Sequence, residues 1–112
     1  MEYPVHVEGQ FTVIALTGDV DLQQSPQARK QILHHVRASA HVLIDLSAVK
    51  YIDSSGVATL VEGFQLAREQ GRVFGLAGVS DTAMQVLHLA RLDKVFAIRS
   101  SITDWLQEPL ER

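Results

Sequence analysis

The sequence has no cysteine, and this absence excludes disulfide bonds, cysteine nucleophiles and cysteine-ligated zinc. The first residues carry neither the basic start nor the apolar run of a secretion signal. No apolar stretch approaches the length of a membrane span. We therefore expect a cytoplasmic protein without membrane insertion.

Positive charge is also scarce. The chain holds 10 Lys and Arg against 13 Asp and Glu, a formal net charge of −3. Surfaces that bind nucleic acid or anionic membranes need concentrated positive charge, so neither is an expected partner. The 112 residues, of which 46% are hydrophobic and 21% charged, are typical of one globular domain. We expect a single domain over residues 1–112.

Catalytic and cofactor motifs are missing as well. The chain lacks Gly-x-Ser-x-Gly and a Walker lysine, and residues 75–78 lack the third glycine of a dinucleotide loop. The five histidines form no zinc pattern, because the adjacent His34 and His35 point about 100° apart on a helix. We expect His88 to pack at the edge of the core. The sequence thus predicts no enzyme, no cofactor and no metal site.

What the chain does have is an alternation of strand and helix patterns. Strands are expected at residues 3–8, 11–17, 42–46, 72–77 and 95–98. Helices are expected to begin with a Ser25 cap, after residue 53, at Ser80 or Asp81, and with a capping box at Ser101. The first two strands should pair as a hairpin. This order predicts an α/β fold, with a mixed four- to five-stranded sheet and about four helices.

The strand at 42–46 leads, through residues 47–52, to Asp53-Ser54-Ser55-Gly56 and a helix that Gly71 should stop. Ser54 and Ser55 therefore lie where a strand passes into a helix. Free backbone N–H groups and the helix dipole favour an anion there, which suits a serine that acquires a phosphate. Asp and Ser are also the preferred N-caps, and from the spacing alone we favour the interpretation that the tetrapeptide is a cap and nothing more.

Nearby residues give further expectations. In open α/β sheets functional loops follow the carboxyl ends of parallel strands, as do Ser54 and the loop expected at 18–21. Whether these loops adjoin depends on strand order. We expect Asp45 to accept hydrogen bonds from nearby loop amides. Gly56 and Gly63 lie on one side of the helix, which indicates a closely approaching partner, neighbouring element or tight packing.

Residues 43–47 and 49–56 together resemble the signature of STAS domains, named for sulphate transporters and anti-sigma factor antagonists. Residues 18–22 are similar to that family's Gly-Glu-x-Asp loop, with Asp19 in place of the commoner Glu. Residues 92–96 are similar to its late Leu-Asp-Lys-x-Phe element. The resemblance covers nearly the whole chain in order. It implies a free-standing STAS domain, with a mixed sheet packed on one side by several helices.

The resemblance also implies a partner-switching function in bacterial transcription regulation and signal transduction. In anti-sigma factor antagonists, the first serine of this tetrapeptide is phosphorylated by an ATP-dependent kinase that doubles as the anti-sigma factor. A PP2C-type phosphatase reverses the modification. That role falls on Ser54, with Ser55 as a secondary candidate. Asp21 would lie beside the switch serine, and Asp53 and Gly56 would complete the partner-binding site.

Two other functions stay open at this point. STAS-like domains also serve as structural subunits of lipid-transport ABC complexes or stress-signalling scaffolds, sometimes without a switch serine. Retention of both serines favours the phosphorylated switch over that alternative. A small serine hydrolase would require an activity that Ser54→Ala abolishes, and we do not expect one. The sequence predicts no oligomeric state.

Overall fold

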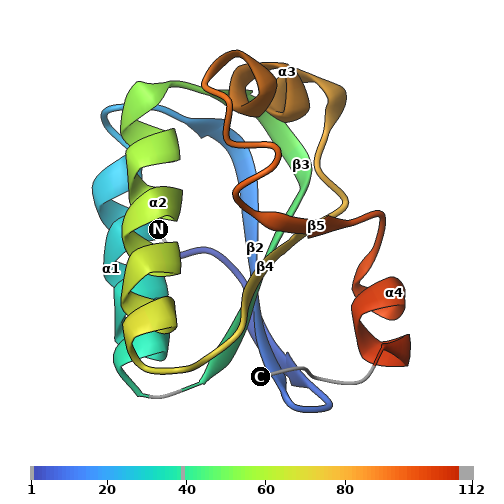
Figure 1. Ribbon diagram of the computed structural model, residues 1–112. Coiled ribbons are helices and arrows are strands. Elements are labelled where there is room, and N and C mark those ends of the chain that lie inside the picture. The colour runs from blue at the N-terminus through green and yellow to red at the C-terminus, as the bar shows by residue number, and fades with distance from the viewer. Residues whose placement is uncertain (1, 39, 109–112) are drawn as a thin grey trace.

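The structure is a computed structural model that describes residues 2–38 and 40–108. Its centre is a five-stranded mixed sheet with the order β1-β2-β3-β4-β5 (Figure 1). The strands are β1 (Val5–Glu8), β2 (Phe11–Val20), β3 (His41–Ile52), β4 (Phe74–Ala77) and β5 (Ala97–Arg99). The helices are α1 (Ser25–Arg37), α2 (Ser54–Glu69), α3 (Asp81–Leu89) and α4 (Ile102–Gln107).

The first two strands form an antiparallel hairpin, and every later strand pairs in parallel with its neighbour. Successive parallel strands are linked by α1, α2 and α3, as the alternation of patterns predicted. The α/β class, the opening hairpin and the mixed sheet are therefore confirmed. Among the described residues, no helix combines the length and apolar character needed to cross a membrane.

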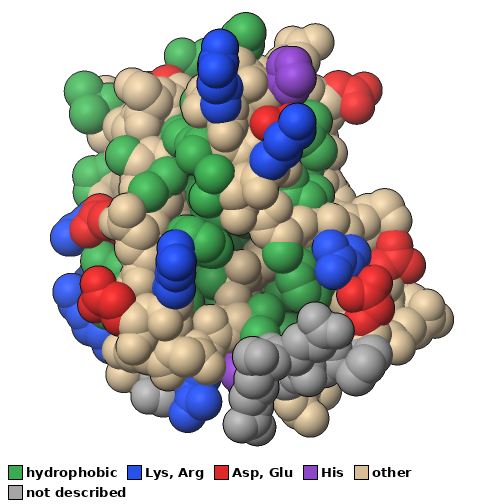
Figure 2. All heavy atoms as spheres, in the orientation of Figure 1, with side chains coloured by type: hydrophobic (Ala, Val, Ile, Leu, Met, Phe, Trp, Pro, Cys, Tyr) green, Lys and Arg blue, Asp and Glu red, His purple; other side chains and the backbone are tan. Residues whose placement is uncertain are grey.

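Side chains alternate between the two faces of the sheet, and helices cover both faces unequally. The larger core lies between the sheet and α1, α2 and α3. Figure 2 shows apolar side chains gathered between α2 and β5, with charged side chains around the margin. The opposite face carries a smaller core that α4 covers (Figure 1). Three helices thus match the expected one-sided packing, and α4 does not. The smaller core consists of Phe11, Val13, Leu43, Ala77 and Trp105.

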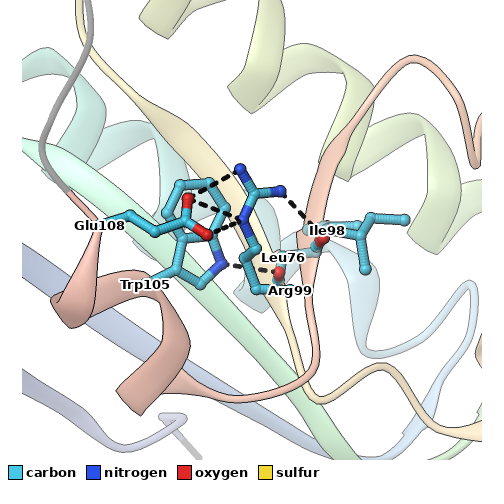
Figure 3. A network of polar contacts seen from close by, with 5 residues as sticks. All are labelled: Leu76, Ile98, Arg99, Trp105 and Glu108. Atoms are coloured by element: carbon cyan, nitrogen blue, oxygen red, sulfur yellow. Dashed lines mark hydrogen bonds and ion pairs between the residues drawn. The ribbon is translucent and has the colours of Figure 1, made fainter.

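One tryptophan holds α4 on the sheet. The indole Nε1–H of Trp105 donates to the carbonyl of Leu76 at 2.9 Å, and the guanidinium of Arg99 lies 4.9 Å from the ring centroid (Figure 3). Arg99 also pairs with Glu108 at 3.0 Å. A Cβ at Gly75 would lie 2.1 Å from the Trp105 ring, so only glycine lets the indole pack this closely against β4. The short helix depends on this anchor.

Two expected boundaries were wrong at the start of α1. The predicted loop at 18–20 is strand, because β2 stays paired with β3 as far as Val20 and Ile52, through two register shifts, between Ala15 and Thr17 and between Gly18 and Asp19. Ser25 is not the N-cap; Gln24 holds that position, without a side-chain hydrogen bond. Asp21 supplies the local acceptor instead, taking the backbone N–H groups of Gln23 and Gln24 at 3.1 Å.

Other local predictions fared differently. Ser80 and Ser101 are the N-caps of α3 and α4, as expected. The capping box at Ser101 is only half formed, because the Asp104 carboxylate bonds the Ser100 hydroxyl. His88 does not pack at the core edge: its side chain is 74% exposed on the outer side of α3, where it contacts Asp93.

Candidate functional site

The candidate site lies where the ends of β2 and β3 meet the start of α2. Val20 is the register partner of Ile52, and the N–H of Asp53 donates to the Val20 carbonyl at 3.3 Å. Asp21 and Asp53 therefore follow paired positions at the same edge of the sheet. The two loops adjoin, which the sequence had left open.

Asp53 is the N-cap of α2. Its Oδ1 accepts the N–H of Ser55 at 2.9 Å, the N–H of Gly56 at 3.2 Å and the Ser55 hydroxyl at 2.5 Å. The donated Ser55 hydroxyl is the main cause that lowers the pKa of Asp53, and backbone N–H groups of Gly56, Ser55 and Leu22 lower it further against partial desolvation. The carboxylate is thus held in its charged form.

This cap corrects one expectation about the helix start. The sequence predicted free backbone N–H groups that could receive an anion. The N–H groups of Ser55 and Gly56 instead bond the Asp53 carboxylate, and the N–H of Val57 donates to the Asp53 carbonyl at 3.0 Å. An anion on Ser54 would therefore still be stabilised by the helix dipole, but it would not receive hydrogen bonds from these N–H groups, because they already donate to Asp53.

The two serines have different environments. Ser54 is the first residue of α2, it is exposed, and its hydroxyl bonds no other residue in the described part of the chain. Ser55 is half-buried and donates its hydroxyl to Asp53. The cap interpretation accounts for Asp53 and Ser55, and it leaves the exposed hydroxyl of Ser54 without a structural role.

Gly56 fixes how closely the helix start approaches the sheet. A Cβ at this position would lie 2.7 Å from the Val20 carbonyl oxygen and 2.7 Å from Cγ1 of Ile52. The first turn of α2 therefore rests directly on the ends of both strands. The close approach expected from the helix glycines comes from neighbouring elements, here and at Gly63, where a Cβ would lie 2.6 Å from Ile32.

An acidic hollow of about 560 Å³ lies beside the end of β2. Its lining includes Glu2, Asp19 and Asp21 together with Lys50 and Tyr3. Burial raises the pKa of the Tyr3 hydroxyl, and the nearby Asp21 carboxylate raises it further. Negative charge therefore gathers on the side of the site where Asp21 was expected.

Two exposed side chains near the site were missed by the sequence interpretation. Leu22 is 74% exposed, and Tyr51 is 49% exposed. The sequence offered a clue to each exposure. Leu22 is an apolar residue within a polar run, and Tyr51 precedes Ile52, whose side chain points into the core, so the Tyr51 side chain points to the other face of the strand. Leu22 and Tyr51 thus add exposed apolar surface near the ends of β2 and β3.

Asp45 behaves as predicted, since its Oδ1 accepts the N–H of Ser47 at 2.9 Å. Within residues 2–38 and 40–108, no three His, Asp or Glu side chains gather as a metal site would require. The stretch around Asp45 thus has a local structural role, and the distinctive chemistry of this edge lies in residues 53–56.

The fold and the tetrapeptide agree with one protein family. The family model for the STAS domain matches residues 2–105. The chain belongs to the STAS domain family. The resemblance found in the sequence is thereby confirmed, over almost the full length of the domain.

Relatives of this STAS domain are named after one role. The anti-sigma-B factor antagonist of Listeria monocytogenes is 25% identical over 88 residues, 78% of this chain and 77% of that protein. The solved anti-sigma-factor antagonist STAS protein of Planctomyces limnophilus is 28% identical with a TM-score of 0.86, covering 95% of this chain and 96% of that one.

A third likeness concerns the fold alone. The Bacillus cell fate determinant SpoIIAA, solved in its phosphorylated form, is 18% identical with a TM-score of 0.73. The match covers 94% of this chain and 97% of that chain. The two solved proteins therefore share the architecture of this domain, and the Listeria and Planctomyces proteins carry the name anti-sigma factor antagonist.

Proposed function

We propose that this STAS domain is a partner-switching regulator of the anti-sigma factor antagonist type. Its unmodified form binds a serine-kinase anti-sigma factor or a related switch kinase, and that kinase phosphorylates Ser54. A PP2C-type phosphatase removes the phosphate. The observation that carries the proposal is the exposed Ser54 hydroxyl, which bonds none of the residues that the structure describes, in a turn where Asp53 and Ser55 form the cap.

Two findings about relatives support the proposal. The Listeria and Planctomyces proteins are named anti-sigma factor antagonists. The Bacillus determinant shows that a domain of this fold exists in a phosphorylated form. For this chain both points are inferences by similarity. The mechanism must therefore be argued from the residues around Ser54.

The local charges explain how a phosphate would release a partner. A phosphoserine carries about −1.5 to −2 charges, and at Ser54 it would stand beside the carboxylate of Asp53, whose pKa is already lowered. Because the nearby N–H groups are bonded to Asp53, the new charge stays on the surface. A partner that buries the hydroxyl would then bury an unpaired anion, at a cost of tenfold in affinity for each 1.4 kcal/mol.

The exposed apolar groups give the unmodified site its attraction. Leu22 follows Asp21 directly, and its backbone N–H contributes to the lowered pKa of Asp53, so it lies against the helix start. Tyr51 lies on β3 just before the turn. A partner that covers these side chains gains apolar contact, and the fold of the domain need not change when repulsion drives it off.

Ser55 is the weaker candidate for modification. Its hydroxyl donates to Asp53 at 2.5 Å, so phosphorylation would replace a hydrogen bond by repulsion between two anions inside the cap. Ser54 carries no such bond. The same comparison makes Ser55 a control at the adjacent position, because its hydroxyl is half-buried and bonded to Asp53 whereas that of Ser54 is exposed.

The test uses the purified protein, its cognate kinase and ATP. Mass spectrometry should locate phosphate on Ser54, and Ser54→Ala should abolish the modification while Ser55→Ala retains it. In calorimetry, Ser54→Ala should bind the kinase like wild type and Ser54→Asp should not. Wild-type affinity in Ser54→Asp would overturn the mechanism. Absence of phosphate, together with transporter genes beside this one, would favour the structural-subunit alternative.

A further inference from the structure

The strand β1 forms one edge of the sheet and has a partner on one side only. The N–H of Ala15 donates to the carbonyl of Pro4 at 3.0 Å, so Pro4 faces β2. Hydrogen-bonding direction alternates along an antiparallel strand, so His6 also faces β2, while the N–H and C=O of Val5 and Val7 point outward. An open row of this kind is a template for another strand.

The side chains of β1 are also exposed to solvent. Val7 is 71% exposed and Val5 is 38% exposed. His6 and Glu8 lie on the other face of the strand, where their side chains contact each other at 2.8 Å and are 52% and 39% exposed. The edge therefore offers two valines on one face and a hydrogen-bonded pair, His6 with Glu8, on the other.

We propose that this edge binds the same edge of a second copy of the chain. The two β1 strands pair antiparallel about a two-fold axis at Val7, so that each Val7 N–H donates to the Val7 carbonyl of the other copy. The two five-stranded sheets then form one continuous sheet. This interface contains no residue of the Ser54 site and does not depend on the proposed function.

Contacts between imidazole and carboxylate groups favour this register over the one that places Val5 opposite Val7. With Val7 opposite Val7, each His6 lies opposite Glu8 of the second copy, in a pair without backbone hydrogen bonds and with Cα atoms about 4.5 Å apart. Each imidazole then has a carboxylate on both sides, its own and that of the second copy. Placing Val5 opposite Val7 would instead set the two His6 side chains against each other.

The proposed interface is small, so the association should be weak and visible only at high protein concentration. Sedimentation velocity over a concentration series should show a monomer–dimer equilibrium for the wild-type protein. Hydrogen exchange at the Val7 amide should slow as the concentration rises, whereas exchange at His6 should not change. A monomer at every concentration would overturn the proposal.

The first variant tests the backbone pairing. Val7→Pro removes the outward N–H without removing any bond to β2, and proline is tolerated on an edge strand. Two symmetric hydrogen bonds are lost in the dimer, so the association constant should fall about 30-fold. Val7→Thr keeps the N–H and should dimerise like wild type. Unchanged dimerisation of a folded Val7→Pro protein would contradict the proposal.

A pair of charge variants tests the register. His6→Glu gives two carboxylates on the edge, and Glu8→Lys gives two basic groups, so each variant alone should dimerise at least tenfold more weakly than wild type. A mixture of the two should form heterodimers, because each cross-strand pair then joins a carboxylate to a lysine ammonium or to an imidazole. Failure of the mixture to associate, with both proteins folded by circular dichroism, would refute this arrangement.

Discussion

Replacing Gly56 by alanine tests whether the first turn of α2 is held as tightly against the sheet as the structure indicates. The added Cβ would lie 2.7 Å from the Val20 carbonyl oxygen and 2.7 Å from Ile52 Cγ1. The carbonyl belongs to the backbone of a buried strand and cannot rotate away. The start of the helix must therefore retreat, which strains the Asp53–Val20 hydrogen bond, already 3.3 Å long.

Two opposing effects decide the magnitude. Alanine is favoured over glycine within a helix by about 1 kcal/mol. Overpacking a buried contact costs about 1–3 kcal/mol, and we expect the upper part of that range, about 2–3 kcal/mol, because one of the clashing atoms here is fixed. We expect Gly56→Ala to lower the free energy of unfolding by about 1–2 kcal/mol, or roughly 4–8 °C in melting temperature for a domain of this size.

Urea denaturation followed by circular dichroism measures this change. Ala58→Gly is the matched control, because Ala58 is exposed on the same helix and its substitution changes helix propensity without a steric clash. Propensity alone predicts that Gly56→Ala stabilises the protein as much as Ala58→Gly destabilises it. A Gly56→Ala protein as stable as wild type, or more stable, would refute the tight contact. A retreating helix start should also slow phosphorylation of Ser54.

Two further predictions concern the anchor of α4 and the cap. Trp105→Phe keeps an aromatic ring but removes the indole N–H that bonds the Leu76 carbonyl, so the free energy of unfolding should fall by about 0.5–1.5 kcal/mol in the same denaturation assay; no change would contradict the anchoring role. Ser55→Ala should raise the pKa of Asp53 towards its usual value, as followed by carboxyl NMR titration. Because a lowered pKa stabilises the folded state only while the carboxylate is charged, Ser55→Ala should be less stable than wild type at neutral pH. That difference should shrink as the pH falls through the pKa of Asp53 in the folded state, and a pH-independent difference would contradict the cap geometry.

The order of elements was accessible from the sequence because its patterns are local. Alternating and amphipathic segments, with serines at the starts of α3 and α4, depend on near neighbours in the chain. The start of α1 was not accessible in this way. Ser25 has the residue type of a cap. However, pairing with β3 extends β2 to Val20, and the Asp21 carboxylate then accepts a hydrogen bond from the backbone N–H in the turn that follows.

The candidate site shows the same limit. The sequence located the tetrapeptide at the start of a helix. It could not show which of its residues form the cap and which one is left available for modification. The answer depends on the rotamer of the Asp53 side chain. In the structure its carboxylate, and not a serine hydroxyl, accepts hydrogen bonds from the backbone N–H groups and from the Ser55 hydroxyl. The loop that adjoins Asp21 is set by the strand order, and the exposure of Leu22 is set by the side chains that pack around it. Neither can be read from neighbouring residues in the sequence.

The central claim is that a charge on Ser54 repels the partner without refolding the domain. The most direct test compares unmodified and Ser54-phosphorylated protein in calorimetric titrations with the kinase, alongside amide NMR spectra of both forms. We predict at least about tenfold weaker binding by the phosphorylated form, with spectral changes confined to the start of α2 and the adjoining strand ends. Equal affinity, or changes spread through the whole sheet, would contradict the account.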